Sequence, residues 1–487
     1  MTSRELLALL AVAVPAVAAA VVGLVPRRAV GAAAVTGGVA GATVALALTV
    51  VALARPDEPF VGKWVVVDAA SGLFLAVVAL VGLGSVVVSP AYLRSIGSSV
   101  VREHRRPRTY YAVLLLFWAA LAAVPLAGNL PGAWLAVEAT TAASALLVGF
   151  TGSPRALEAG WKYLILTSLG LGVALLGIVL LAAGVPGGGL GGLSWEALPS
   201  FSSGADTALV AYLLVLAGLA AKIGWAPVHN WLPDAHSEAP PPVSALLSAA
   251  LLPCVLLVAW RSEQALAPVV GEATAQSALV AFGLLSLAVA IPFLWRALAW
   301  KRLLAYSSLE HMGVIAVGVA FATPLALAGV AVHVVGHAIA KAIGFYAAAP
   351  LLAHDPRAAR HQVTGVARTD SRLGATLGIS LGALAGLPPS PLFASEVLIV
   401  AGGFQAGRPW EAAVAAVLLA LGFLGLAHAL VETTVGNAPR RGRRAVARLA
   451  PLGVMVAVAT GALLVLAGLA PFLPDSDLVT ALRRGIG

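Results

Sequence analysis

Cysteine and charged residues are both scarce in this sequence. Among 487 residues there is one cysteine, Cys254, and only 10% of the residues are charged. A single cysteine cannot form a disulfide framework or supply the several thiolates that an iron–sulfur or nickel–iron centre requires. We therefore expect no cofactor and no metal in this chain. With 60% hydrophobic residues, the scarcity of charge also excludes a soluble globular protein.

Long apolar runs dominate the sequence instead. Fourteen runs reach about 20 residues, the length that a helix needs to cross about 30 Å of hydrocarbon. The sequence therefore predicts an all-α polytopic membrane protein with about 14 transmembrane helices. The predicted spans are 6–25, 29–54, 65–89, 110–127, 131–151, 156–183, 207–227, 241–260, 274–298, 303–322, 326–350, 373–401, 410–435 and 451–472.

The loops between these spans alternate in charge. Most of the 30 Lys and Arg residues follow odd-numbered spans, including the clusters REHRRPR at 102–108 and RRGRR at 440–444. Because positively charged loops stay in the cytoplasm, we expect the odd loops inside and both termini on the outer side of the cell membrane. The net charge of +9 then reflects orientation and predicts no nucleic-acid partner. The even loops and the termini hold only Arg4, Arg55, Lys63, Arg261, Arg408, Arg483 and Arg484.

A lysine in span seven stands out from this pattern. Lys222 follows the apolar run LVAYLLVLAGLAA and precedes a segment broken by Pro227, Pro233 and three prolines at 240–242. An ammonium group in hydrocarbon costs several kcal/mol and is retained mainly for function. Broken helices at membrane depth are tolerated where their freed backbone lines a cavity. The segment therefore predicts an ion pathway at a broken helix.

Span twelve carries a similar break, GLPPSP at 386–391, followed by Glu396. Two interrupted helices five spans apart predict two five-helix repeats, and an odd number of spans makes the second repeat inverted. The predicted parts are 1–109 (helices 1–3), 110–260 (helices 4–8), 261–435 (helices 9–13) and 436–487 (helix 14).

Two further ionisable residues lie near Lys222 in the predicted order of spans. Glu138 is in the middle of span five, and with Lys222 it can form a switchable ion pair or a merely structural buried pair. Lys162, near the cytoplasmic end of span six, has two interpretations. It can extend to the lipid headgroups, or it can lie between Glu138 and Lys222 and pass protons between them.

Span eleven carries ionisable residues at intervals of four. His333, His337 and Lys341 fall on one face of a helix, about 6 Å apart along its axis. Neutral imidazoles can accept and donate protons, which favours a relay. A His-x-x-x-His metal site is the alternative, but the sequence offers no obvious third ligand.

Four more acidic or histidine residues fall in or beside predicted spans. Glu310 and His311 open span ten. Asp68 in span three and Glu432 in span thirteen are compatible with helix-end or inter-subunit roles, and we assign neither a function.

Six segments occur in an order that resembles a known family. The chain resembles the antiporter-like membrane subunits of respiratory complex I, membrane-bound nickel–iron hydrogenases and multisubunit cation/proton antiporters. The WKY and YSSLEHMG segments are most similar to the F-type subunit of hydrogenase-4 and formate hydrogenlyase complexes. The segments that carry the resemblance are LAVEATTAASALLVGF, EAGWKYLILTSLG, KIGWAPVHNWLPDAHSEAPPPVSALLS, KRLLAYSSLEHMG, HVVGHAIAKAIGF and GLPPSPLFASEVLI.

The resemblance implies roles for the ionisable residues. Glu138 matches the family's carboxylate of span five and Lys222 its central lysine, while Glu396 matches the ionisable group that ends the axis. Ser248 departs from the pattern, because many relatives carry a lysine or histidine there, so an unbroken side-chain route is in question. The residues that match the central hydrophilic axis are His311, His333, His337 and Lys341.

The function that the resemblance implies is proton translocation by a non-redox subunit of an energy-converting oxidoreductase. The partners that it implies are other membrane subunits and a peripheral arm that carries iron–sulfur or nickel–iron centres. A subunit of a sodium/proton antiporter without a redox partner is the alternative. A structural scaffold that retains its charges without transport is a third.

Overall fold

The computed structural model describes residues 2–95, 107–185, 189, 192–437 and 450–485. The first half contains α1 (Ser3–Leu24), α2 (Val30–Ala54), α3 (Ala69–Ser95), α5 (Pro107–Leu126), α6 (Leu130–Val148), α7 (Pro154–Gly184), α8 (Ala205–Ile223), α9 (Trp231–Glu238), α10 (Pro241–Leu246) and α11 (Leu252–Val270). The second half contains α12 (Glu272–Leu294), α13 (Trp300–Phe321), α14 (Pro324–His354), α15 (Val366–Thr369), α16 (Ser371–Leu384), α17 (Pro391–Gln405), α18 (Pro409–Val435), α19 (Ala450–Leu469) and α20 (Asp477–Arg484). A small antiparallel pair, β1 (Phe60–Val61) and β2 (Val66–Val67), joins α2 to α3.

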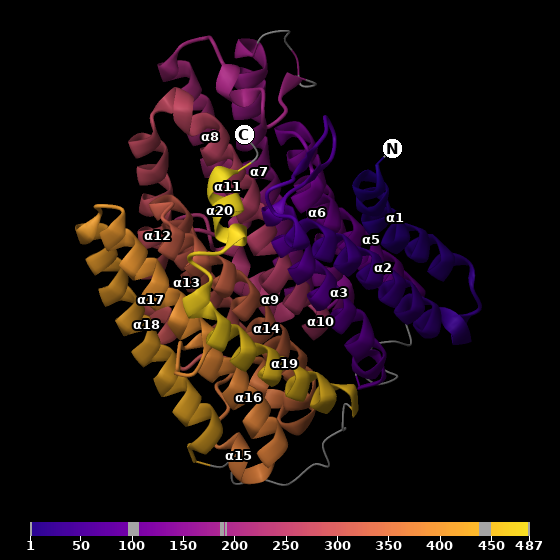
Figure 1. Ribbon diagram of the computed structural model, residues 1–487. Helices are drawn as coiled ribbons and strands as arrows, with labels where there is room; N and C mark the ends of the chain where they lie inside the picture. The colour runs from indigo at the N-terminus through magenta and orange to yellow at the C-terminus, as the bar shows by residue number, and fades with distance from the viewer. Residues whose placement is uncertain (1, 96–106, 186–188, 190–191, 438–449, 486–487) are drawn as a thin grey trace.

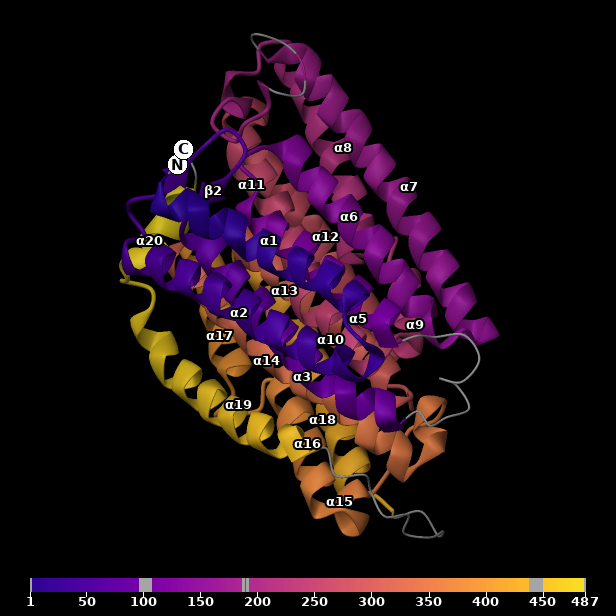
Figure 2. The ribbon, with the colours of Figure 1, turned by 90° about the vertical axis from the view of Figure 1, so that its right-hand side faces the viewer.

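The helices form one bundle (Figure 1). Within the described residues, 13 helical segments are long and apolar enough to cross a membrane. The shorter α16 and α17 together occupy the predicted span twelve, so the prediction of an all-α polytopic membrane protein with about 14 spans is confirmed. The two termini lie at the same end of the bundle (Figure 2), as an even number of crossings requires.

Burial divides the helices into a centre and a periphery. The apolar stretches of α13 and of the segment 241–270 are wholly buried, and α14 is almost so. By contrast α19 is mostly exposed and crosses the outer side of α3, α14 and α17 (Figure 1). Lipid can cover an apolar periphery without cost, whereas polar side chains must find partners inside the protein. The central helices are therefore the ones that can hold ionisable groups.

The break in span seven begins directly after Lys222. Helix α8 ends at Gly224, whose φ of +79° is in the left-handed region that favours glycine. The freed backbone finds partners in the protein: Trp231 Nε1 donates to the carbonyl of Ala221 at 2.8 Å, and the amide of Ala226 donates to Ser286 at 3.1 Å. Backbone groups freed by a broken helix in a membrane need hydrogen-bond partners, and these two bonds supply them.

The second break separates α16 from α17. Gly386, with a φ of +70°, follows the end of α16, and the Ser390 hydroxyl caps α17 by accepting from the amide of Leu392 at 3.1 Å. Both interruptions stand where the prolines predict them. The inverted relation between the two five-helix repeats stays a prediction.

Span eight differs in length from its prediction. Helix α11 continues to Val270, so Arg261 lies inside the helix and not in a loop. Its guanidinium forms a buried ion pair with Asp68 at 2.8 Å and also donates to the carbonyl of Pro125 at 2.9 Å. Asp68 in turn accepts from the amide of Ser71 at the start of α3. Asp68 is thus bound within the chain, and it joins α3 and α5 to the central α11.

The strongest basic clusters fall outside the described residues. These are the predicted orientation signals Arg102, Arg105, Arg106 and the residues 440–444, with Arg448.

Candidate functional site

Lys222 is fully buried in the last turn of α8. Its Nζ donates to Thr141 Oγ1 at 2.7 Å and to Tyr163 Oη at 2.5 Å. Tyr163 in turn contacts Ser144 Oγ at 2.7 Å, and Ser144 donates to the carbonyl of Thr140 at 2.5 Å. The acceptors around Lys222 are therefore neutral hydroxyl groups on α6 and α7, which can bind either protonation state of an amine.

Glu138 lies one turn before Thr141 on α6. Its Oε1 accepts from Ser168 Oγ at 2.9 Å, while its buried Oε2 has no hydrogen-bond partner. Among the ion pairs of the described residues, all with N···O distances up to 4.0 Å, none joins Glu138 to Lys222. Lys222 thus contacts Thr141, one turn after Glu138 on α6, but Glu138 and Lys222 belong to separate hydrogen-bond sets. The switchable pair stays a prediction.

Lys162 lies away from these two groups. Its side chain is 48% exposed and pairs with Glu158 at 2.6 Å and with Asp234 at 3.5 Å. Asp234 also pairs with Arg302 at 2.9 Å. These residues line a polar cavity of about 430 Å³ at one end of α7 and α9. The side chain that reaches Lys222 belongs to the next residue, Tyr163, which the sequence analysis did not single out.

Ser248 lies in a π-helical turn, Leu247–Leu251, between α10 and α11. Its hydroxyl contacts Ser308 Oγ of α13 at 2.7 Å, and both serines are fully buried. The neighbouring Ser307 accepts from Lys341 Nζ at 2.5 Å, and Lys341 also donates to the carbonyl of Leu304. Single π turns are frequent at functional sites. Hydroxyl groups of adjacent residues on α13 thus bind Ser248 on one side and Lys341 on the other.

His236 of α9 is a second residue that the sequence analysis did not single out. It is fully buried, and its Nδ1 contacts the carbonyl of Leu232 at 2.8 Å while its Nε2 has no partner. Its ring lies between those of Trp231 and Phe345, at centroid distances of 6.1 and 5.8 Å. The imidazole therefore stands between the broken α8–α9 segment and α14, the helix of Lys341. Its position in a segment of aromatic residues and prolines was the available signal.

Glu310 is buried against α18. Its Oε2 has no hydrogen-bond partner, and its carboxyl group packs against Gly422, where a Cβ atom would lie 3.0 Å from the carboxyl carbon. Only a glycine at 422 leaves space for this carboxylate.

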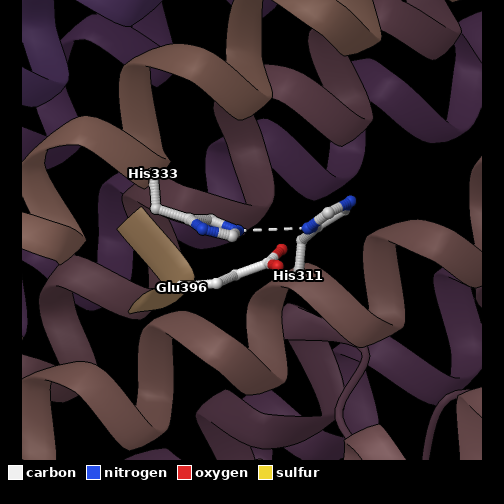
Figure 3. Close-up of side chains that lie close together, drawn as sticks. All are labelled: His311, His333 and Glu396. Atoms are coloured by element: carbon white, nitrogen blue, oxygen red, sulfur yellow. Dashed lines mark hydrogen bonds between the residues drawn. The ribbon is translucent and has the colours of Figure 1, made fainter. Parts of the chain in front are cut away.

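The ionisable groups on the central helices form a row that begins at Lys222. At its other end, three histidines and a carboxylate meet. His311 Nδ1 lies 3.1 Å from His333 Nε2, and Glu396 extends its carboxylate toward the same point (Figure 3). His337 lies beside them, with its ring centroid 5.1 Å from that of His311 and both ring nitrogens unpartnered. The sequence predicted these residues individually, Glu396 after the break in span twelve, His333 and His337 on the stripe of span eleven and His311 in span ten; the structure brings them together.

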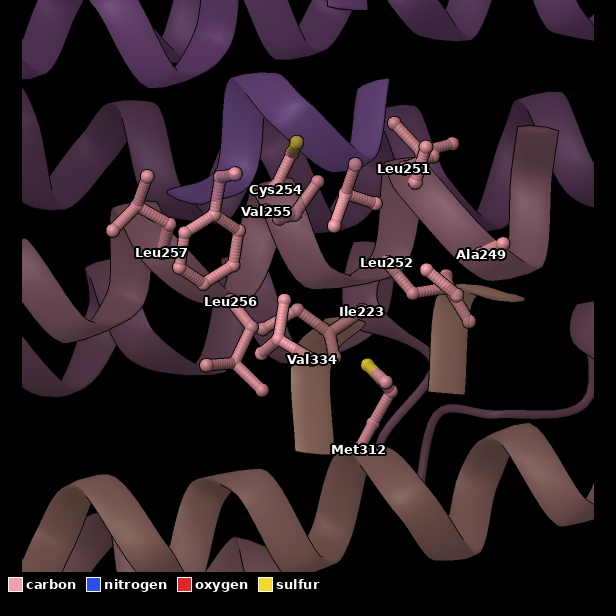
Figure 4. Packing of buried hydrophobic residues seen from close by; sticks show 14 of the residues in the cluster. Ile223, Ala249, Leu251, Leu252, Cys254, Val255, Leu256, Leu257, Met312 and Val334 are labelled. Carbon is pink, nitrogen blue, oxygen red and sulfur yellow. The ribbon is translucent and has the colours of Figure 1, made fainter. Parts of the chain in front are cut away.

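Apolar packing surrounds the row. Ile223, Met312 and Val334 directly follow Lys222, His311 and His333 in the sequence, and they belong to one buried cluster with residues of α11 (Figure 4). Bulk water is therefore excluded from most of the row, which leaves room only for individual waters beside the polar side chains.

Comparison with known proteins matches residues 127–422 to the family described as "NADH:quinone oxidoreductase/Mrp antiporter, TM". The chain is 31% identical over 393 residues to the "Hydrogenase-4 component F homolog" of Methylacidiphilum infernorum, covering 79% of this chain and 81% of that protein. It is 29% identical over 385 residues to "NADH-quinone oxidoreductase subunit N" of Desulforudis audaxviator, covering 76% of this chain and 73% of the relative.

Solved structures show the same fold. A chain of an archaeal membrane-bound sulfane sulfur reductase superposes with a TM-score of 0.85 at 21% identity, covering 99% of this chain and 98% of the other. A chain of the Mrp complex from Dietzia sp. DQ12-45-1b gives a TM-score of 0.83 at 22% identity, covering 100% and 98%.

Proposed function

Because this chain belongs to the family of NADH:quinone oxidoreductase and Mrp antiporter transmembrane subunits, we propose that it translocates protons in a hydrogenase-4-like respiratory complex. The observation that carries this proposal is the row of ionisable groups on the central helices, which begins at the buried Lys222 and ends at the partly exposed Glu396. Its similarity to subunits of a hydrogenase, of an NADH-quinone oxidoreductase and of a sulfane sulfur reductase supports other membrane subunits as partners, together with a peripheral arm that performs the redox chemistry.

Glu138 and Lys222 are proposed to form the switch. A carboxylate near an ammonium group favours the protonated lysine, whereas desolvation favours the neutral amine. Movement of Glu138 toward Lys222 would load a proton, and its withdrawal to Ser168 would release it. The neutral contacts with Tyr163 and Thr141 support this reading, because they hold Lys222 in place in both states.

The released proton is proposed to move toward α14 and α17. Ser248 and Ser308 supply hydroxyls between the broken segment and α13, and Lys341 follows through Ser307. His337, His311 and His333 then lead to Glu396. Waters are required between these groups, and the open π turn at Ser248 gives them backbone carbonyls to bind.

The polar cavity around Lys162 and Asp234 is the proposed entrance. By the predicted topology it faces the cytoplasm, and its mixed charges hold water next to α7 and α9. Lys162 would then act at the surface of the protein.

The test of this function is the Lys222→Ala variant in the whole complex, reconstituted in vesicles. Removing the amine should abolish proton uptake while the complex still assembles. Lys222→Arg should not restore uptake, since a guanidinium does not deprotonate in a protein. Glu138→Gln should weaken uptake strongly. Normal uptake by an assembled Lys222→Ala complex would support the scaffold hypothesis instead.

A sodium/proton antiporter subunit is the second candidate, favoured by the full-length superposition on the Mrp chain. Purification through a tag on this chain separates the two. Co-purifying nickel–iron or iron–sulfur subunits support the hydrogenase-type complex, and only small hydrophobic subunits support the antiporter.

A further inference from the structure

The point where α13, α14 and α17 meet has the donor set of a transition-metal site. His311, His333 and Glu396 come from three different helices, and one ligand atom of each lies within 4.8 Å of the others (Figure 3). The sequence alone suggested His333 and His337 as a metal pair without a third ligand. The fold supplies the missing ligands from α13 and α17, and replaces His337 in the set by His311.

The spacing of the atoms suits a small divalent ion. Zinc binds imidazole nitrogens at about 2.0–2.1 Å, and tetrahedral geometry then separates two ligand atoms by about 3.4 Å. His311 Nδ1 and His333 Nε2 are already 3.1 Å apart. The two histidines are buried, and Glu396 is the member that is partly exposed, at the wall of a cavity of about 530 Å³ between α17 and α18.

Hydrogen bonds around the cluster fix the direction of its protons. Ser395 Oγ donates to the carbonyl of Leu392 at 2.7 Å, so it accepts from His333 Nδ1 at 2.8 Å. His333 Nε2 is then a lone-pair acceptor, and His311 Nδ1 donates to it. The Ser395 contact is of the kind that orients a metal-binding histidine through its second nitrogen.

A metal ion needs changes only in the protons of this arrangement. His333 already directs a lone pair at the point of convergence. His311 must move its proton from Nδ1 to Nε2, and the buried Nε2 is unpartnered and free to take it. Binding thus requires a tautomer shift of a neutral imidazole and an ionised Glu396, whose negative charge then offsets part of the charge of the ion.

We propose that His311, His333 and Glu396 form an inhibitory site for Zn²⁺ or a similar divalent transition-metal ion. The ion occupies the place of the proton between the two imidazoles, and His311 Nε2, now protonated, can no longer accept one. The binding half of the proposal stands on geometry, and the inhibitory half rests on the proposed proton transport.

Binding is tested with Co²⁺, a spectroscopic substitute for Zn²⁺, on the whole complex after treatment with a chelator. The wild type should take up one Co²⁺ per copy of this chain with the intense visible absorption of a four-coordinate ion, and Zn²⁺ should displace it. His333→Gln and Glu396→Gln should each weaken this binding at least about tenfold. His229→Gln is the matched control, because His229 lies in the α8–α9 break, outside the cluster, and should leave binding unchanged.

Assembly of each variant complex is checked by gel filtration, so that lost binding is not a folding defect. Equal Co²⁺ uptake and equal spectra in the wild type and both cluster variants would overturn the proposal. In the vesicle assay, Zn²⁺ should inhibit proton uptake by the wild type, and a chelator should restore it; Co²⁺ binding without inhibition by Zn²⁺ would overturn the inhibitory half. If the proposed function is wrong, the Lys222→Ala complex will take up protons normally, and this result is separate from the Co²⁺ binding.

Discussion

At the scale of single residues, the contacts of Lys222 assign distinct roles to two neighbours in the sequence. Lys162 is at the surface in an ion pair with Glu158, whereas Tyr163 contacts Lys222 in the interior. Successive residues of a helix point about 100° apart, so only one of the two can face α8. The i,i+4 spacing of Glu158 and Lys162 is typical of an exposed pair and was the signal in the sequence for this difference.

The first residue-scale prediction concerns the Tyr163 hydroxyl. Tyr163→Phe removes one acceptor from Lys222, and hydrogen bonds to charged groups contribute about 1.5–3 kcal/mol. Proton uptake by reconstituted vesicles should fall at least about tenfold. Tyr212→Phe is the control, since the Tyr212 hydroxyl donates to the carbonyl of Ala275 away from Lys222. Equal losses in the two variants would show that the Tyr163 contact with Lys222 has no special role.

At the scale of elements, close packing of α18 on α13 positions a buried carboxylate. Gly422 has no side chain, and Glu310 occupies the space that a Cβ atom would fill. Gly382, on α16, faces α18 with ordinary room, because a Cβ atom there would lie 3.8 Å from Leu430. The two glycines thus differ in what they accommodate, although both are at helix interfaces.

Gly422→Ala should therefore displace the Glu310 carboxylate and reduce proton uptake several-fold, in a complex that still assembles. Overpacking of this kind costs about 1–3 kcal/mol, which a protein with many helices can absorb. Gly382→Ala should leave uptake unchanged. Full activity in the Gly422→Ala variant would show that proton uptake does not depend on the position of the Glu310 carboxylate.

At the scale of the whole molecule, the buried Asp68–Arg261 ion pair connects the start of α3, in the N-terminal part, to the central helix α11. Removing one member of a buried pair leaves an unpaired charge and costs about 3–5 kcal/mol. Arg261→Met should lower the midpoint of thermal unfolding of the complex, and Asp68→Asn together with Arg261→Met should recover part of the loss. Identical midpoints for wild type and Arg261→Met would mean that this pair does not stabilise the assembly.

Orientation in the membrane is the second prediction at this scale. The distribution of loop charges predicts that both termini are outside, and the termini lie at the same end of the bundle. A reporter fused after Gly487 that works only outside the cytoplasm should therefore be active. Activity of a cytoplasm-specific reporter at the same position would reverse the assignment and place the Lys162 cavity on the outer side.

The sequence by itself determined the all-α membrane-spanning fold and the His333–His337–Lys341 stripe, because these depend on local composition and helical spacing. Most of the buried ionisable groups on the central helices could also be recognised, since a charge in an apolar run needs no structure to be noticed, but His236 and Arg261 lie in less apolar segments and needed the structure. Only the tertiary structure decided which groups meet. Tyr163 rather than Lys162 contacts Lys222, Ser248 meets Ser308, and His311 and Glu396 join His333, because these contacts depend on how helices far apart in the sequence rotate and pack against one another. The π turn at Ser248 belongs to the same class, since no local residue preference marks it, whereas its contacts with α3 and α14 and the Ser248–Ser308 hydrogen bond to α13 come from the tertiary structure.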